Sequence, residues 1–351
     1  MVPLIDLSRR MARHSAEFLP IVGEIMAGGN ILLGSRTADF ETSFAAFAGG
    51  KHGVAVSSGA SALQLSLAAL GIGEGDEVIV PAMTAVPTAS SVCAVGARPI
   101  FVDVDQNTAA IDVDQVRAAL TPRTRAVIVV HLYGRPATDV ATLMMLGIPV
   151  IEDCAQSHGA TFGISGTIAA YSFYPTKNLG GIGDGGMVVT DNDEMVEQLR
   201  RLRVHGQSAQ YVHVDISQNH RMSEIEAGWL ELTLPFLAAD NRRRHAIVSR
   251  YRAAAPHLTW QSRHENHVYH LAVVRVEDRE SFRESLNDRG VATGIHYPLA
   301  LTQQPALKKF TTRECPQAEA WAAECVSLPC FPELTDTEVE TVCDVLARVA
   351  K

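Results

Sequence analysis

A lysine in a glycine-rich setting is the first residue of this sequence that suggests chemistry. Lys177 follows the run Ser-Phe-Tyr-Pro-Thr and precedes a segment with five glycines, from Gly180 to Gly186. A lysine that loses its proton through burial can attack a carbonyl carbon and form a Schiff base. A lysine in a glycine-rich loop is also compatible with a merely exposed residue, so Lys177 alone leaves both interpretations open.

An aspartate at the end of an apolar run is the second such residue. Asp153 follows Pro149, Val150 and Ile151 closely, and a carboxylate buried there needs a cationic or hydrogen-bonding partner. A protonated pyridine nitrogen would be such a partner, because the carboxylate keeps the ring positive and electron-withdrawing. The other interpretation is an N-cap of the helix that follows the strand.

A serine-rich turn offers a place for a phosphate group. The run from Ser57 to Ser61 separates a short apolar segment from a helical one, so its N–H groups and hydroxyls would lie at the positive end of a helix. Ser172, five residues before Lys177, could supply another hydroxyl. The alternatives are a serine-capped helix start and an ordinary strand serine.

The elements that position these residues follow from an alternation of β-branched and amphipathic segments between about residues 50 and 190. Such alternation is typical of a parallel sheet covered by helices. Ligands of these sheets bind at the carboxyl ends of the strands, where the serine turn, Asp153 and Lys177 stand. We predict an α/β fold with a large, mixed, mostly parallel seven-stranded sheet, whose strands contain VAVSS from Val54, EVIVP from Glu77, RPIFVDVD from Arg98, RAVIVVHLYG from Arg125, PVIEDCA from Pro149, AAYSFYP from Ala169 and GGMVVTD from Gly185.

The second half of the chain predicts a smaller α+β unit. A helix is expected around residues 192–205, followed by a long loop at 205–222, which is typical of a functional excursion. A helical region at 223–255 then leads to a strand at 267–276, a helix at 283–290, a strand-like segment at 293–298 and a final helix. We expect a large domain at 1–238, with residues 1–15 able to pack on the small domain, and a small C-terminal domain at 239–351.

Composition excludes several classes of protein. The 351 residues are 47% hydrophobic and 20% charged, as in an ordinary globular enzyme, and a net charge of −9 gives no basic face for nucleic acid. No apolar run approaches the length of a membrane span, and the N-terminus lacks the apolar core of a signal peptide, so we expect a cytoplasmic protein. We expect reduced thiols and no metal site, because the cysteines show no CxxC pair: Cys93, Cys154, Cys315, Cys325, Cys330 and Cys343.

Taken in order, these segments resemble the DegT/DnrJ/EryC1/StrS family of sugar aminotransferases, which are fold-type I enzymes dependent on pyridoxal 5'-phosphate (PLP). The resemblance covers nearly the whole chain. It rests on PLIDL, LGSRTADFETSFAAFAGGKHGVAVSSGASAL, GEGDEVIVPAMT, GARPIFVDVD, TPRTRAVIVVHLYGRP, IEDCAQSHGA, YSFYPTKNLGGIGDGG, RVHGQ, NHRMSEIEAG and GIHYPLALTQQ.

The resemblance implies a role for each of the residues that match the family's motifs. Lys177 would hold PLP as a Schiff base and move the proton during transamination, and Asp153 would pair with the pyridinium. The remaining cofactor contacts would come from Ser58, Gly59, Ala60, Ala85, Ala155, Gln156 and Ser172, and from Asn219 of the partner subunit in a homodimer. Substrate contacts would come from Arg221, for the carboxylate of the amino donor, and from His296 and Tyr297. A structural ion pair for Arg221 and a simply hydrogen-bonded His296 are the alternatives.

Two positions depart from the family's pattern. Ala60 replaces a common Thr or Ser, so a hydroxyl contact to the phosphate is lost unless Ser58 or Ser61 replaces it. Ala85 stands where the family often has an aromatic residue stacked on the outer ring face. We expect another side chain to cover that face in part, because an uncovered apolar ring forfeits burial.

The expected reaction is transfer of an amino group from an amino acid, glutamate foremost, to a keto group of a nucleotide-linked sugar. A keto-cyclitol acceptor is the first alternative. A PLP enzyme that does not transaminate and a PLP-binding regulator without turnover are the others. Dehydrating relatives have histidine in place of the Schiff-base lysine, so Lys177 argues against that reaction.

Overall fold

A seven-stranded sheet forms the centre of the computed structural model, which describes residues 1–160 and 164–349. The strand order is β1-β7-β6-β5-β4-β2-β3, in which β7 is antiparallel to both of its neighbours and the other pairs are parallel. All seven predicted strands and the mostly parallel sheet are therefore confirmed. The strands are β1 (His52–Val56), β2 (Glu77–Pro81), β3 (Arg98–Val102), β4 (Thr124–Val130), β5 (Val150–Asp153), β6 (Ile168–Ser172) and β7 (Gly186–Thr190).

Both faces of this sheet are buried, which explains why its strands are almost continuously apolar. Along β2, Val78 and Val80 belong to one hydrophobic cluster and Ile79 to another, as expected when successive side chains point to opposite faces. The helices between the strands are α3 (Gly59–Ala69), α4 (Val86–Ala94), α5 (Val113–Ala119), α6 (Val140–Met144) and α7 (Asp193–Leu202).

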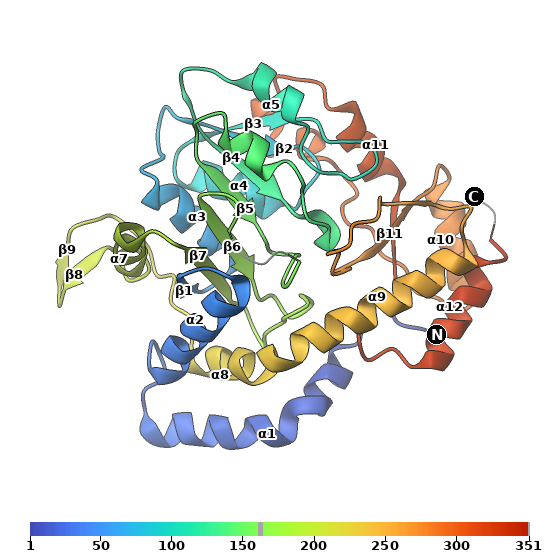
Figure 1. The fold of residues 1–351 in the computed structure, drawn as a ribbon, viewed down its shortest axis with the longest axis horizontal. Helices are drawn as coiled ribbons and strands as arrows, with labels where there is room; N and C mark the ends of the chain where they lie inside the picture. Colours follow the sequence, from blue (N-terminus) through green and yellow to red (C-terminus); the bar gives the residue numbers. More distant parts are fainter. Residues whose placement is uncertain (161–163, 350–351) are drawn as a thin grey trace.

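Three further helices pack together beside strands β1 and β7. Helices α1 (Leu7–Gly28) and α2 (Ser35–Ala48) both contact α8 (Glu224–Thr233), and Figure 1 shows α1 running along the outer edge of this layer. Buried Trp229 of α8 joins Phe40 and Phe44 of α2 in one cluster. Within the described residues, no helix is long and apolar enough to cross a bilayer.

Helix α9 (Leu237–Ala254) leads from the sheet to a second hydrophobic cluster (Figure 1). That cluster contains Tyr251 of α9, but also Val2 from the predicted large domain. Conversely, Trp321 from the predicted small domain packs into the cluster of the large sheet, so each cluster contains residues of both predicted domains. The domain boundary at residue 238 therefore stays a prediction. The surrounding elements are β10 (Thr259–Trp260), β11 (Ala272–Arg275), β12 (Cys325–Leu328), α10 (Arg279–Asp288), α11 (Pro316–Glu324) and α12 (Asp336–Leu346).

Two segments differ from their predictions. The loop at 205–222 contains a short hairpin, β8 (Gln207–Ala209) paired with β9 (Val212–His213), which projects from the body of the molecule in Figure 1. The segment at 293–298 forms no named strand, so that prediction was wrong. Only Gly294 pairs, in an isolated bridge with Ser327, before the chain leaves the edge of β12 and turns towards a cavity beside the sheet.

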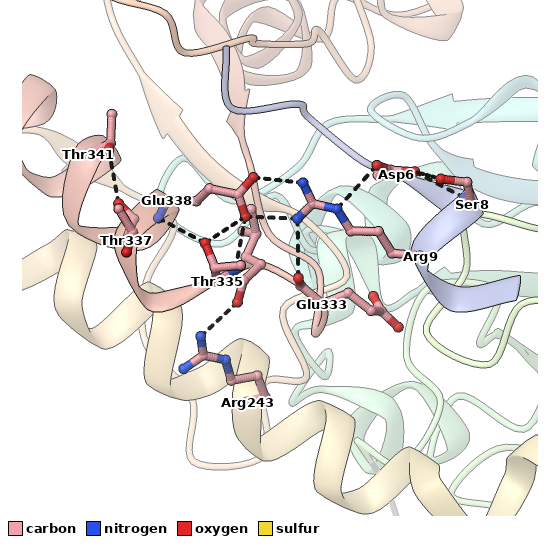
Figure 2. A network of polar contacts seen from close by, with 10 residues as sticks. Asp6, Ser8, Arg9, Arg243, Glu333, Thr335, Thr337, Glu338 and Thr341 are labelled. Carbon is pink, nitrogen blue, oxygen red and sulfur yellow. Dashed lines mark hydrogen bonds and ion pairs between the residues drawn. The ribbon is translucent and has the colours of Figure 1, made fainter. Parts of the chain in front are cut away.

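The N-terminal segment and the first turn of α1 are both fixed by contacts with the C-terminal part of the chain. The amide of Val2 donates to the carbonyl of Gly290 at 2.7 Å, and the Arg9 guanidinium donates to both oxygens of Glu338 at 2.8 and 2.7 Å. Figure 2 shows that Glu338 also accepts from Thr335, the N-cap of α12. One carboxylate thus joins the start of α1 to the start of α12.

We predict that Glu338→Gln lowers the free energy of unfolding by about 1 kcal/mol at neutral pH, because it removes the charge of a bidentate ion pair, whereas a glutamine oxygen still accepts in the capping box. Arg9 lowers the pKa of Glu338 from 4.5 to about 2. The stabilisation is therefore full above the unfolded pKa of about 4.5 and is lost as pH falls through about 2.

Urea unfolding followed from neutral pH down to about pH 3 checks this sign. The control is Glu340→Gln on the same helix, whose carboxylate is more exposed and reaches Arg250 only at 3.4 Å. Equal losses for the two variants at neutral pH would contradict the prediction.

Candidate active site

The carboxyl ends of β1, β5 and β6 meet at one edge of the sheet and form a pocket. Strand β7 is antiparallel to both β1 and β6, so β1 and β6 run in the same direction. Strand β5 is parallel to β6 and therefore runs in that direction too. Their ends carry the serine turn, Asp153 and Ser172. The structure brings together in this pocket the predicted residues Gly59, Ala60, Ala85, Asp153, Ala155, Gln156, Ser172 and Lys177.

Asp153 is held at the floor of the pocket by two hydrogen bonds. Its carboxylate accepts from the Thr88 hydroxyl at 3.0 Å and from the Ala155 amide at 3.2 Å. Burial nevertheless raises the pKa of Asp153, and only these donors and the charges of Lys177 and His131 oppose that shift. The carboxylate would therefore gain from a cationic group placed in the pocket, where its desolvation is not yet compensated.

Lys177 lines this pocket and also a second, larger cavity next to it. Burial lowers the pKa of Lys177 to about 8, although the charge of Asp153 acts in the opposite direction. A substantial share of neutral amine near physiological pH is what a nucleophilic lysine or a lysine base requires.

Helix α3 presents its N-terminus to the same pocket. Ser58 is the N-cap and accepts from the Ser61 amide at 3.0 Å, so the first amides of the helix face the pocket beside Gly59 and Ala60. A Cβ atom on Gly59 would lie 2.5 Å from the Cβ of Ser172, so only glycine permits this approach of α3 to β6. The result is an anion-binding geometry.

The serine neighbours of Ala60 hydrogen-bond one another in this structure, and the replacement of the missing phosphate contact by Ser58 or Ser61 stays a prediction. The hydroxyls of Ser58 and Ser61 lie 3.0 Å apart, and the Ser57 hydroxyl lies 2.9 Å from that of Ser61. These three groups therefore bind one another, and Ser172 supplies the serine hydroxyl that lines the pocket.

Gln156 connects the pocket to the segment at 293–298. Its side-chain oxygen accepts from the Tyr133 amide at 2.6 Å, and its nitrogen donates to the Tyr297 hydroxyl at 3.1 Å. The Tyr133 hydroxyl donates to the carbonyl of His296. One N–H of the Gln156 amide remains available to a ligand oxygen.

The second cavity has a volume of about 360 Å³ and lies where a substrate could approach Lys177. His296 and Tyr297 line it, as predicted for substrate contacts, and the His296 ring also lies 2.9 Å from the Ser327 hydroxyl. Burial, and secondarily Lys177, lowers the pKa of His296, which favours a neutral imidazole.

Asn219 and Arg221 line neither cavity in the described chain. Asn219 is exposed and accepts from the Arg221 guanidinium at 2.9 Å. Their neighbour His220 accepts from the Ser57 amide at 2.8 Å, so this segment lies beside the serine turn of its own chain. The roles assigned to these two residues stay predictions.

Several residues of the site were not predicted from the sequence. Thr88 and Thr84, whose hydroxyls lie 3.0 Å apart, stand four residues apart and flank the predicted Ala85. Their spacing across a helix start is a usable signal, because i and i+4 side chains share a face. Arg244 and His270, which line the second cavity, lie in the small-domain region with no motif to mark them.

Ala85 is the N-cap residue of α4 and lines the pocket without an aromatic ring of its own. Leu63, Pro87 and Val130 also line the pocket and are apolar side chains that can contact a bound ring. Partial cover of the outer ring face by a neighbour stays a prediction.

The fold and this arrangement are those of a known family. A model of the DegT/DnrJ/EryC1/StrS aminotransferase family matches residues 13–347, and the chain belongs to that family. It is 39% identical to the UDP-N-acetyl-3-dehydro-alpha-D-glucosamine 3-aminotransferase of Acidithiobacillus ferrooxidans, with 99% of this chain and 97% of the relative covered. It is also 38% identical to the pleiotropic regulatory protein of Geobacillus stearothermophilus, with 99% and 98% covered.

Solved structures agree in the arrangement of the whole chain. Streptomyces venezuelae DesV, solved in complex with a ketimine intermediate, superimposes with a TM-score of 0.95 at 38% identity over 99% of this chain and 97% of DesV. Bacillus subtilis NtdA with bound cofactor PMP gives a TM-score of 0.94 at 29% identity, with 98% and 84% covered. The protein is thus an aminotransferase, as predicted.

We predict that Lys177 in the cofactor-free protein reacts with an acylating reagent in a pH profile that rises through about 8, because burial favours its neutral amine. Asp153→Asn removes the charge that favours the ammonium, so it should shift the profile to lower pH. Trace labelling with acetic anhydride followed by peptide mass mapping measures both profiles.

Asp184→Asn is the matched control, because it removes a negative charge from an exposed position in the same glycine-rich segment. Profiles for Lys177 that coincide in the Asp153 variant and the native protein would show that the carboxylate does not act on this amine.

Proposed function

We propose that this aminotransferase holds PLP in the pocket at the strand ends and moves an amino group from an amino acid, glutamate foremost, to a keto group of a nucleotide-linked sugar. The observation that carries the proposal is the placement of Lys177 and Asp153 in one buried pocket with the N-terminus of α3. Amine, carboxylate and anion site are the three groups that PLP requires.

The residues of the pocket fit PLP part by part. The α3 amides at Gly59 and Ala60, with the Ser172 hydroxyl, would hold the phosphate, and Asp153 would hold the ring nitrogen in its charged form. The free N–H of Gln156 would reach the ring oxygen. When bound, PLP supplies an electron-withdrawing ring and a carbonyl carbon that carries the amino group between substrates.

Lys177 would have two tasks in this arrangement. Its Nζ would hold the cofactor covalently between turnovers, and once released it would move a proton to and from the substrate's α-carbon. Its position between the pocket and the larger cavity places the amine next to both partners of that transfer.

A nucleotide-linked sugar is the acceptor that the relatives favour. The named activity of the Acidithiobacillus ferrooxidans relative concerns a UDP-linked keto sugar, and a further relative is a dTDP-amino-sugar transaminase. A keto-cyclitol is the alternative acceptor. The relative named as a regulatory protein keeps a regulator without turnover as a second candidate function, against which the complete lysine and aspartate pair argues.

We also propose a homodimer in which Asn219 reaches the phosphate site of the partner subunit. Asn219 is exposed on its own chain, and large apolar side chains nearby in the sequence are almost fully exposed: Tyr211 at 85% in the turn of the β8–β9 hairpin and Ile216 at 104% just after the hairpin. Exposed apolar groups gathered on one projection are typical of a protein interface.

The activity is tested by adding amino acids singly to the PLP-loaded protein. A competent donor should convert the absorbance of the bound cofactor to that of pyridoxamine phosphate, and keto-sugars or keto-cyclitols should reverse it. Borohydride reduction followed by peptide mapping should place the pyridoxyl group on Lys177, and Lys177→Ala should abolish multiple turnover. Conversion by no amino acid would favour the regulator, and a label on another lysine would refute the site.

We predict that Asn219→Ala weakens PLP binding by about 10-fold, the value of one hydrogen bond to a charged group, while the dimer persists. Light scattering under assay conditions gives the mass, and equilibrium dialysis gives the affinity. Gln218→Ala, at an equally exposed neighbouring position, is the control. A fully active monomer, or unchanged affinity in the Asn219 variant, would contradict the shared site.

A further inference from the structure

The larger cavity beside Lys177 has a one-sided charge. Its charged lining residues are Lys177 and Arg244, and burial lowers the pKa of its two histidines, His270 and His296, which favours neutral imidazoles. Its other described lining residues are Leu4, Ile5, Tyr174, Thr176, Leu271, Tyr297, Leu328 and Cys330. No carboxylate belongs to this described lining. A cavity with this lining attracts an anionic group.

Arg244 is the strongest anion-binding group in that lining. The residue is only 1% exposed, and its Nη1 donates to the carbonyls of Cys330 and, at 3.4 Å, of Tyr269. Its Nε and Nη2 atoms are buried and have no hydrogen-bond partner among the described residues. A guanidinium buried without an anion or a full set of acceptors is costly, so three unpaired N–H groups on a residue that lines a cavity point to a ligand that supplies the acceptors.

A second buried guanidinium increases the positive potential around Lys177. Arg10 donates to the carbonyls of Pro175 and Lys177 at 2.8 and 3.0 Å. Burial and the charge of Arg244 lower the pKa of Arg10 to about 10, so Arg10 stays charged at neutral pH close to the Arg244 guanidinium. An anion bound in the cavity would relieve this repulsion.

We propose that Arg244 binds the α-carboxylate of the amino donor, in place of the role predicted for Arg221. The proposal rests on the proposed function, in which Lys177 moves the proton of the donor's α-carbon. The carboxylate is one bond from that carbon, so it must lie close to Lys177, and Arg244 lines the same cavity. A guanidinium binds a carboxylate through two parallel hydrogen bonds.

The diphosphate of a nucleotide-linked acceptor is the other source of an anion. It is separated from the reacting keto carbon by part of the sugar ring, whereas the α-carboxylate of an amino acid is adjacent to its reacting carbon. A group next to Lys177 therefore fits the donor better. Arg221 lies outside the cavity of its own chain, where its guanidinium binds Asn219. In the proposed dimer it would approach the partner's site together with Asn219, so the test compares the two arginines directly.

The test compares L-glutamate with isoglutamine, in which the α-carboxylate is a neutral amide of nearly the same shape. The concentration that half-saturates cofactor conversion is measured for the native PLP-loaded dimer and for Arg244→Gln, Arg244→Lys, Arg221→Gln and Arg242→Gln. Arg242 is an exposed neighbour on the same helix and controls for loss of a positive charge. Cofactor content and thermal melting establish that each variant is folded.

The native enzyme should prefer glutamate to isoglutamine by about 10- to 100-fold, the value of hydrogen bonds between two charged groups. Arg244→Gln should abolish that preference by weakening glutamate alone, and Arg244→Lys should keep part of it. A preference that survives in Arg244→Gln, or that disappears in Arg221→Gln instead, overturns the proposal. If Arg244→Gln raises the half-saturating concentration of the keto-sugar and leaves that of glutamate unchanged, Arg244 binds the acceptor. That result would also overturn the proposal.

The comparison of glutamate with isoglutamine on the native protein does not depend on whether a variant folds. If it binds isoglutamine as tightly as glutamate, no residue recognises the α-carboxylate and the proposal fails. If no amino acid converts the bound cofactor at all, the proposed function fails first, and this outcome is seen before any variant is made.

Discussion

The structure depends on keeping an amine and a carboxylate out of water in one pocket. Asp153 ends the buried strand β5, and Lys177 follows the next strand of the sheet. Neither charge is fully compensated by the protein, since burial raises the pKa of Asp153 and lowers that of Lys177 to about 8. A ligand that brings a cation to Asp153 and a carbonyl to Lys177 therefore stabilises this pocket.

The positions of these two groups follow from how the backbone packs at the sheet edge. Strand β7 runs back between β6 and β1, and a Cβ on Gly186 would lie 2.2 Å from the carbonyl of Ser58. Together with the close contact at Gly59, this draws the N-terminus of α3 onto the ends of β6 and β7. The anion site and the amine therefore belong to one rigid unit, which suits a cofactor that must be held at both ends.

The sequence allowed the sheet, its seven strands and the pocket residues next to strand ends to be predicted, because parallel strands read as apolar runs and their carboxyl ends lie together. The segment at 293–298 was not predictable as a loop, since its short pattern resembles a strand and only tertiary contacts hold it away from β12. The Tyr133 hydroxyl donates to the His296 carbonyl, and the Gln156 amide donates to the Tyr297 hydroxyl. Arg244 was missed for a different reason. It stands in the basic run of a long helix, where an arginine normally faces solvent, and only tertiary packing buries it.

The walls of the larger cavity come from parts of the chain that are distant from the sheet in sequence. Thr176 and Lys177 follow strand β6 of the sheet, but Leu4 and Ile5 of the N-terminal segment, Leu328 at the end of β12 and Cys330 just after it form other walls. The N-terminal walls are fixed by the Val2 hydrogen bonds and by the ion pair of Arg9 with Glu338, which Figure 2 shows. None of these residues lines the pocket at the strand ends. Substitutions in these chain ends can therefore reshape the space for a substrate while the groups that act on the reacting carbon keep their geometry.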